Sequence, residues 1–378
     1  MIREQTIEYK IVSLIGLAGE VQTEELYKLK YGKEYIRKTI SKLITKKCIK
    51  VYKFDNKKYL RLTVNCKRYL LENYPERFES LFVGAARANK IRNEDHRRKR
   101  YHRLGELLIL LDLADIKIFS DEKTLWKRTH GFTEADGTDF TDYSSDKKTA
   151  EFYTTTELKS FGLLGNARTS RAMGIIYSHP DVFAIYYFTD EFPKLEYKTE
   201  HSFCYGIGLG IHMHLRRDYD TCTKIIFIGD SMKIFNGILR DKRKSTEKIL
   251  KMNDYDDPVM FLDKSHLGSR QLRYFINEKA RKEMKEYSYN YFGAENTGWH
   301  IGSIPNTRTA VRDCTICNPR VISFVKYISK EETVEIKAIN VTCFDFQYEC
   351  IRKFIGDSDS IKYYTYDSEK VLGTEDTR

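Results

Sequence analysis

The first 64 residues carry an order of hydrophobic patterns that few folds satisfy. Apolar residues recur three times at helical spacing, and two short runs of alternating apolar residues follow them. Gly19 ends the first helix, and Thr23 is placed to cap the second. The helices are expected at residues 4–17, 23–29 and 33–47, and the strands at residues 48–54 and 58–63. Three helices followed by a β-hairpin predict a winged helix-turn-helix.

The third expected helix, from Lys33 to about Lys47, has an apolar and a basic side. The apolar side consists of Tyr35, Ile36, Ile40, Leu43 and Ile44. The basic side consists of Lys33, Arg37, Lys38, Lys42, Lys46 and Lys47. Such a helix fits the major groove of DNA, where its cations first meet phosphates and only some reach base edges. Lys53, Lys57 and Lys58 of the hairpin would then meet the neighbouring DNA backbone.

The positive charge of the chain is concentrated near its N-terminus. Residues 1–104 hold 26 Lys and Arg against 12 Asp and Glu, a net charge of +14, whereas the rest has a net charge of −3. Residues 65–104 are expected to be basic connecting helices, with a cation cluster at Arg97, Arg98, Lys99, Arg100 and Arg103. Charge confined to one module suits a polyanion, so double-stranded DNA is the expected partner. The alternative is a winged helix that contacts proteins and merely exposes a solvated charge run.

After residue 104 the pattern changes to strands alternating with helices. This predicts an α/β domain with a mixed sheet over residues 105–378, subdivided, if at all, near residues 200–220 or 293–312. Strands are expected at residues 152–159, 182–189, 225–229, 259–262, 321–328, 334–341 and 361–364. Helices are expected at residues 168–178, 232–252, 268–291 and 344–355. The fold class expected for the whole chain is therefore α+β multidomain.

Composition narrows the class of protein further. With 41% apolar and 31% charged residues, the chain is expected to fold rather than remain disordered. No apolar run reaches the roughly 18 to 20 residues that cross a bilayer, and the N-terminus lacks the pattern of a signal peptide. We therefore expect a cytoplasmic protein with no membrane partner. Its eight scattered cysteines are expected to be reduced thiols.

Two strings near the first domain carry a family resemblance. From Tyr59 the chain reads YLRLTVNCKRYLLENYPERF, and from Arg100 it reads RYHRLGELLILLDLADIKIF. This part, about the first third of the chain, resembles the replication-relaxation type of winged-helix proteins, which occur on plasmids and other mobile elements of Gram-positive bacteria. The segment from Ser170 to Gly174 and the strand FAIYYFT also resemble uncharacterised relatives from such elements. The resemblance implies a second domain related to restriction-endonuclease folds and a role in replication, transfer or transcriptional control. It brings no catalytic residue.

Glu157 and Lys159 are the strongest catalytic candidates. On a strand, residues two apart face one way, so the carboxylate could hold Mg²⁺ while the ammonium steadies an attacking water or the scissile phosphate. A further carboxylate is needed from Asp139, Asp142, Asp146 or Glu151, of which Asp142 is the preferred choice, and Glu106 from the upstream helix would complete the set. Either an inactive nuclease-like domain or a surface ion pair explains the same Glu-x-Lys pattern. No cofactor is expected unless the protein is a nuclease, which would use Mg²⁺.

Two further motifs have metal-ligand residue types but incomplete spacing. Cys314 and Cys317 are spaced as in a zinc knuckle, yet the next pair, Cys343 and Cys350, is six residues apart across a strand-to-helix junction. Buried thiols are therefore expected, with no metal. His212 and His214 would share a face on a strand but have no third ligand nearby in the sequence. Asp230, after the apolar run 225–229, is interpreted as a helix cap.

These observations favour a sequence-specific, non-enzymatic double-stranded DNA-binding protein whose second domain forms a homodimer or recruits partners. Such a protein binds DNA in a salt-sensitive manner and needs no divalent metal. The competing hypothesis is a Mg²⁺-dependent nuclease or nickase that the winged helix targets to DNA. A winged-helix scaffold for protein contacts is a third class, and it would not bind DNA even at low salt.

Overall fold

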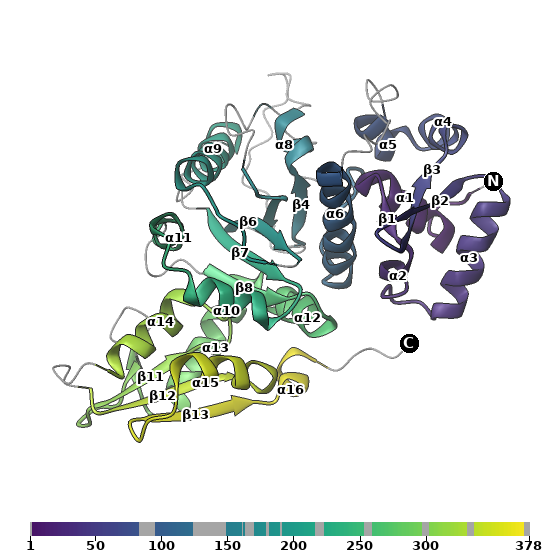
Figure 1. The fold of residues 1–378 in the computed structure, drawn as a ribbon. Coiled ribbons are helices and arrows are strands. Elements are labelled where there is room, and N and C mark those ends of the chain that lie inside the picture. The colour runs from purple at the N-terminus through teal and green to yellow at the C-terminus, as the bar shows by residue number, and fades with distance from the viewer. Residues whose placement is uncertain are drawn as a thin grey trace, which may run out of the picture. The chain divides into compact units, whose positions relative to one another are not determined.

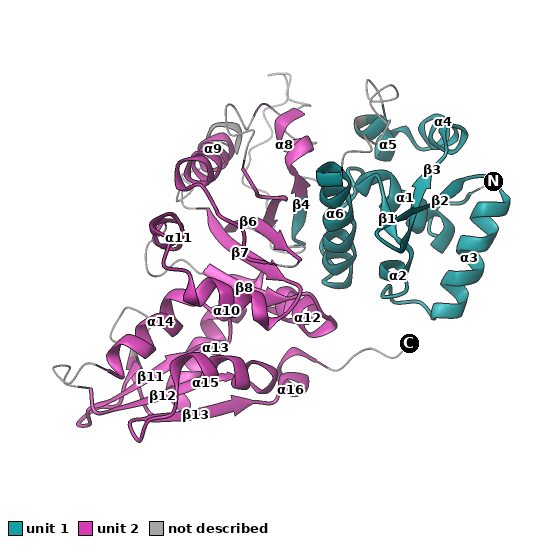
Figure 2. Cartoon of the chain, in the orientation of Figure 1, with its two compact units in different colours: residues 1–152, 378 teal, residues 153–377 magenta. Residues whose placement is uncertain are grey.

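The computed structural model describes residues 2–82, 95–123, 149–160, 162, 170–178, 181–189, 191–215, 223–252, 259–296, 302–330 and 336–373 (Figure 1). The chain divides into two compact units, which Figure 2 colours separately. Unit 1 comprises residues 1–152 and unit 2 comprises residues 153–377. Both contain helices and mixed or antiparallel sheets, so the expected α+β multidomain class is confirmed. None of the described helices is both long enough and apolar enough to cross a membrane.

Unit 1 begins with the three helices and the two hairpin strands that the sequence predicts, together with a two-residue strand that the sequence does not predict. The first six elements are α1 (Ile7–Ala18), β1 (Val21–Gln22), α2 (Thr23–Leu26), α3 (Lys33–Thr45), β2 (Ile49–Phe54) and β3 (Lys57–Leu62). The strands form an antiparallel sheet in the order β1-β3-β2. Thr6 caps α1 by accepting from the backbone N–H of Tyr9, and Gly19 ends the helix with a positive φ of 84°.

The hairpin β2–β3 turns on two residues, Asp55 and Asn56. Their φ values of 49° and 58° lie in the left-handed region, which Asn and Asp adopt more readily than most residues. Positive φ at both positions is typical of the tight turn that joins antiparallel strands. The turn therefore fixes the register, in which Lys53 lies opposite Lys58 and Tyr52 opposite Tyr59.

Three helices follow the hairpin in unit 1, namely α4 (Val64–Asn73), α5 (Pro75–Phe82) and α6 (Asp95–Leu113). Helix α6 contacts α1 and β1, and Gly105 lies where it passes β1. A Cβ at residue 105 would be 3.2 Å from the Val21 side chain and 3.3 Å from the Glu20 carbonyl oxygen. The boundary expected at residue 104 is therefore wrong, because that residue lies inside one continuous helix that packs on the N-terminal elements.

The described residues after α6 form two five-stranded sheets, both in unit 2 apart from residues 151–152. The first has the order β4-β5-β6-β7-β8, in which β6, β7 and β8 are parallel and β5 is antiparallel to β6. Its strands are β4 (Glu151–Thr154), β5 (Gly174–Ser178), β6 (Asp181–Phe188), β7 (Lys224–Gly229) and β8 (Val259–Asp263). The associated helices are α8 (Thr155–Ser160), α9 (Tyr197–Leu215), α10 (Met232–Arg240) and α11 (Lys244–Leu250). β6, β7 and β8 are buried along almost their whole length, as parallel strands covered on both faces usually are.

The second sheet has the order β13-β12-β11-β10-β9, with β11, β12 and β13 parallel. Helices α12 (His266–Phe275) and α13 (Glu278–Tyr291) lead into it from β8. Its strands are β9 (Glu295–Asn296), β10 (Gly302–Ser303), β11 (Thr309–Asp313), β12 (Ala338–Phe344) and β13 (Ile361–Tyr366). Helices α14 (Pro319–Ile328) and α15 (Tyr348–Ile355) connect the parallel strands, a short 3₁₀ turn (Asp345–Gln347) precedes α15, and α16 (Ser368–Leu372) ends the described chain.

Several predicted elements of unit 2 are wrong. Residues 321–328, expected as a strand, lie in α14, which Asn318 caps and Pro319 begins. The predicted strand 152–159 is strand only as far as Thr154. The predicted helix 168–178 contains β5 where it is described. The expected helices 232–252 and 268–291 are each two helices, and the strands at 182–189, 225–229, 259–262 and 361–364 are confirmed.

Candidate nucleic-acid interface

Helix α3 has a buried and an exposed face that are both defined by helical spacing. Ile36 and Leu43 have no exposed area, and Thr39 and Ile40 are buried between them. On the opposite side, residues at three- and four-residue intervals are exposed, namely Glu34, Lys38, Ser41 and Thr45. α3 therefore presents to solvent a surface of charged and hydroxyl side chains, the donor and acceptor types that read base edges.

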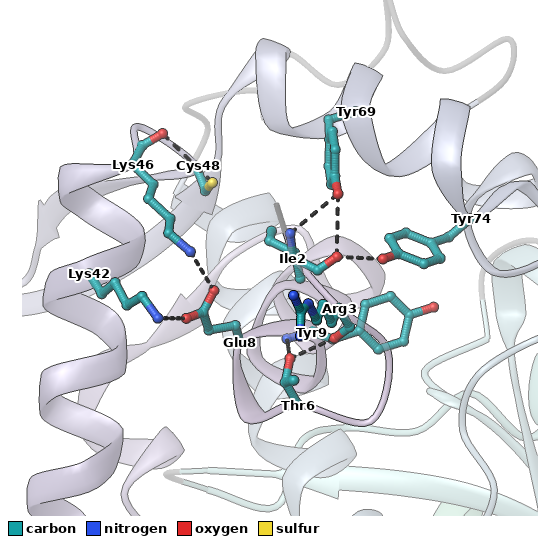
Figure 3. A network of polar contacts seen from close by, with 10 residues as sticks. All are labelled: Ile2, Arg3, Thr6, Glu8, Tyr9, Lys42, Lys46, Cys48, Tyr69 and Tyr74. Carbon is teal, nitrogen blue, oxygen red and sulfur yellow. Dashed lines mark hydrogen bonds and ion pairs between the residues drawn. The ribbon is translucent and has the colours of Figure 1, made fainter.

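Three of the α3 cations have ion-pair partners. Arg37 pairs with Glu34 one turn earlier at 2.9 Å, and both side chains are largely exposed. Figure 3 shows Lys42 and Lys46, on successive turns, reaching Glu8 of α1 at 2.5 and 2.9 Å. Burial raises the pKa of Glu8, but the hydrogen bonds from both lysines outweigh it and leave the pKa below its ordinary value. Glu8 therefore links α3 to α1 and neutralises part of the positive charge of Lys42 and Lys46.

The remaining predicted cations are Lys33 and Lys38 of α3 and Lys47, which lies just after the helix. All three are exposed, and none has an ion pair with another described residue. Lys33 lies over the ring of Tyr27, with 5.5 Å between its Nζ and the ring centroid. Lys38 lies at the centre of the exposed face and is therefore the side chain best placed to contact a ligand on α3.

The hairpin adds a second group of lysines. Lys50, Lys53, Lys57 and Lys58 are all exposed. Lys53 and Lys58 are directly opposite each other in the register, and two like charges at such positions destabilise a hairpin. This repulsion is relieved when an anion lies between or beside them, so the hairpin is suited to a phosphate backbone.

Arg98 of α6 does not belong to this surface. Its guanidinium donates to the buried carboxylate of Glu20 at 2.6 Å, and Arg61 of β3 donates to the same carboxylate at 2.8 Å. Burial raises the pKa of Glu20, but the hydrogen bonds from His102, Arg98 and Arg61 outweigh it and lower the pKa to about 2. The expectation that Arg98 contacts DNA is wrong, because this side chain is buried and neutralises a carboxylate inside unit 1.

The other α6 cations that the sequence predicts to contact DNA differ in their exposure to solvent. Lys99 and Arg100 are exposed, whereas Arg97 and Arg103 are half-buried. The Nε of Arg103 donates to the carbonyl of Lys99 at 3.3 Å. Helix α6 is therefore first a packing element of unit 1, and its cations are secondary candidates for phosphate contact.

Glu157 and Lys159 do not form the strand site that was expected. Both lie on α8, where residues two apart face different sides, and Glu157 is buried while Lys159 is exposed. The Glu157 carboxylate accepts from the backbone N–H and the hydroxyl of Thr154, and the Thr154 hydroxyl accepts from the N–H of Glu157. This reciprocal pattern is a capping box, so Glu157 stabilises the start of α8.

The additional carboxylates do not complete a metal site either. Asp142, with Asp139 and Asp146, lies outside the described residues, and Glu106 lies on helix α6 of unit 1. Across the described ranges, no group of three or more His, Cys, Asp or Glu side chains is placed to hold a metal. Mg²⁺ catalysis through the Glu-x-Lys pattern has no structural support in this part of the chain.

The four C-terminal cysteines and the two histidines are also accounted for locally. Cys314, Cys317, Cys343 and Cys350 are free and buried. Burial raises the pKa of Cys314 and Cys317, which keeps them as unreactive thiols. The residues His212 and His214 lie in helix α9, so the expected strand there is wrong. Ser231, rather than Asp230, caps α10, and Asp230 pairs with Lys264.

Sequence reasoning missed several residues of this surface. Tyr35 and Ile44, expected in the core, are 57% and 40% exposed on the flanks of α3. Ser41 and Thr45 were not singled out, although they follow Lys38 at three and seven residues on the same face. A helical projection centred on Ile36, Ile40 and Leu43 would have found all four.

Comparison with models of known protein families, with curated proteins and with solved structures gave no match to this chain. The resemblance to replication-relaxation proteins therefore stays a prediction.

Proposed function

We propose that the chain is a sequence-specific double-stranded DNA-binding protein in which residues 1–64 form a winged helix. The order α1-β1-α2-α3-β2-β3 with a β1-β3-β2 sheet supports this. In the proposed complex α3 enters the major groove and β2–β3 follows the adjacent backbone. Lys38 and Ser41 would approach base edges, while Lys53 and Lys58 would meet phosphates.

The observation that carries the proposal is the exposed face of α3. In α3 the core contacts come from one side only, so the opposite face is free to contact another molecule. Helix α3, the turn after it and the hairpin together present seven lysines without an ion pair to another described residue, Lys33, Lys38, Lys47, Lys50, Lys53, Lys57 and Lys58. A surface of this charge gains most from a polyanion that releases counterions on binding.

Fluorescence anisotropy with a labelled duplex tests the proposal. We expect the affinity to fall steeply between about 50 and 200 mM salt, as for proteins that neutralise several phosphates, with no requirement for Mg²⁺. Lys38→Ala should weaken binding and lower the slope of log K against log salt by about 1. Lys30→Ala removes an equal charge from an exposed pair with Asp115 and is the matched control. Equal affinities of the two variants, or no binding in dilute buffer, would refute the proposal.

The biological setting rests on the resemblance alone. A replication-relaxation relative would act on a plasmid or another mobile element, in replication, transfer or transcriptional control, and its second domain would be related to restriction-endonuclease folds. Selection of bound fragments from a plasmid and chromosome library tests the setting. Enrichment of mobile-element sequences is the expected result, and enrichment of chromosomal sequences alone would contradict it.

A further inference from the structure

A cavity of about 260 Å³ in unit 2 combines several cations with few carboxylates. It lies between the start of β7, helix α13, and the segment that joins β11 to α14. Four basic side chains line it, namely Lys224, Arg281, Lys282 and Lys285, together with the carboxyl groups of Glu278 and Asp313. All of its lining residues belong to unit 2, whereas the proposed DNA-binding surface belongs to unit 1, so its chemistry needs a separate account.

Two of the cations, Lys224 and Arg281, are held in place by contacts with a buried carboxylate. Lys224 and Arg281 both pair with the buried carboxylate of Asp181, and Arg281 also donates to the carbonyl of Phe275 at 2.6 Å. The half-buried Lys285 has no ion pair within 4 Å to a described residue. Its Nζ lies 5.8 Å from the ring centroid of Tyr289, which also lines the cavity.

Asn318 supplies a second, independent indication of the ligand. Only 1% of this residue is exposed, and its Oδ1 is used to cap α14 by accepting from the N–H of Arg320 at 3.0 Å. Its amide nitrogen, a donor, makes no hydrogen bond to another described residue. Val321, in the first turn of α14, also lines the cavity. Pro319 has no N–H and that of Arg320 is capped by Asn318, so the N–H of Val321 is the donor of this turn that has no partner within the helix.

Cations, an amide donor and a helix N-terminus converging on one cavity are the groups that bind oxyanions. We propose that this cavity binds a compact oxyanion of the phosphate or phosphomonoester class. Lys285 and Asn318 would donate to its oxygens, while Lys224 and Arg281 would supply the positive field. The phosphate can come from a free phosphorylated molecule or from a nucleic-acid backbone, and the chemistry of recognition is the same for both.

Asp313 sets the charge at one wall of the cavity. Burial raises the pKa of its carboxyl to about 6, although hydrogen bonds from Thr315 and Thr342 and the charge of Lys285 act in the opposite direction. The ionised carboxylate repels an oxyanion, whereas an amide at the same position can donate to it. Asp313→Asn should therefore tighten oxyanion binding, by severalfold.

Isothermal titration of the full chain with inorganic phosphate, and separately with sulfate, tests the proposal at neutral pH. We expect saturable binding to one site, weakened at least about tenfold by Lys285→Ala and by Asn318→Asp. Asp is as good a helix cap as Asn, so Asn318→Asp keeps α14 while replacing the donor with a negative charge. Lys279→Ala, on the same helix with an 82% exposed side chain, is the control and should bind like the unmodified chain.

Equal binding by the unmodified chain, Lys285→Ala and Asn318→Asp would overturn the proposal, as would no saturable binding up to phosphate concentrations on the order of 10 mM. A second titration in the presence of saturating duplex identifies the source. If phosphate still binds, the ligand is a free phosphorylated molecule. If duplex displaces phosphate, and Lys285→Ala weakens duplex binding, the ligand is a backbone phosphate. Because the variants lie in unit 2, failure here leaves the Lys38 test of unit 1 unaffected.

Discussion

Two basic helices of unit 1 use their cations in opposite ways. Helix α3 leaves Lys33 and Lys38 in solvent, whereas α6 buries Arg98 on the carboxylate of Glu20. Both helices are rich in Lys and Arg, so the difference comes from whether a buried carboxylate lies within reach. A cation that neutralises such a carboxylate stabilises the fold, and a cation without one is available to a ligand.

The largest loss of stability is expected from a change in the buried cluster of Glu20, Arg98 and Arg61. Glu20→Gln removes the charge that Arg98 and Arg61 neutralise and leaves two guanidinium groups near a neutral amide. We expect the free energy of unfolding of unit 1 to fall by about 3–5 kcal/mol, the range for breaking a buried ion pair. Native-state hydrogen exchange of the β1 and α6 amides measures it.

The control for Glu20 is Glu34→Gln on α3. Glu34 pairs with Arg37 in an exposed i,i+3 pair, so the loss of stability should be far smaller than that of Glu20→Gln. If the two variants lost the same stability, the distinction between the buried and exposed cations would be wrong.

Lowering the pH should destabilise the same buried cluster of Glu20, Arg98 and Arg61. The pKa of Glu20 is about 2 in the folded state, against a model-peptide value of 4.5. A depressed carboxyl pKa contributes stability that is fully present above about pH 4.5 and is lost as the pH falls toward 2. The loss from this group is about 3 kcal/mol at 1.36 kcal/mol per pKa unit. Urea unfolding at a series of pH values should therefore show the difference between the unmodified chain and Glu20→Gln shrinking below pH 4.5. A difference that stays constant would contradict this.

The two helices also show what a sequence can and cannot predict. The three helices and the hairpin of the first 63 residues follow from apolar spacing, from Gly19, and from the turn residues of the hairpin. The structure confirms them, with the short strand β1 added and with α2 ending at Leu26. The burial of Arg98 could not be predicted, because its partner Glu20 is 78 residues away and is brought near only by the packing of α6 on β1. The order of helices and strands can be predicted from the spacing of apolar residues, whereas a contact between residues far apart in the sequence cannot.

Other errors concern signals that were present in the sequence. Thr154 to Glu157 reads Thr-Thr-Thr-Glu, a capping-box pattern, but the β-branched threonines favoured a strand. Asn318 followed by Pro319 is a typical helix start, yet the apolar run after it was also interpreted as a strand. In both places the capping residues were the better guide than β propensity. The oxyanion cavity, which draws on α13, β11 and α14, had no such local signal.

On the exposed side, Glu8→Gln should alter DNA binding more than stability. Glu8 holds Lys42 and Lys46, so its neutralisation frees both lysines for phosphate. We expect duplex affinity to rise by about 1.5-fold to fivefold, the equivalent of an exposed ion pair worth about 0.2–1 kcal/mol, with a steeper salt dependence. Anisotropy titration at two salt concentrations measures both quantities. Unchanged or weaker binding would mean that α3 does not face the duplex.

The smallest change in stability is expected for Lys53→Ala, which should nevertheless weaken DNA binding. Lys53→Ala removes one of two like charges that face each other across the hairpin, so it should leave the hairpin as stable or stabilise it by a few tenths of a kcal/mol. The same change removes a proposed phosphate contact, so it should weaken duplex binding and lower the salt slope by about 1. Hydrogen exchange of the β2 and β3 amides and anisotropy titration are to be made on the same preparation. A variant that loses both stability and affinity would show that Lys53 supports the fold, as Arg98 does, and the contrast between exposed and buried cations would not extend to the hairpin.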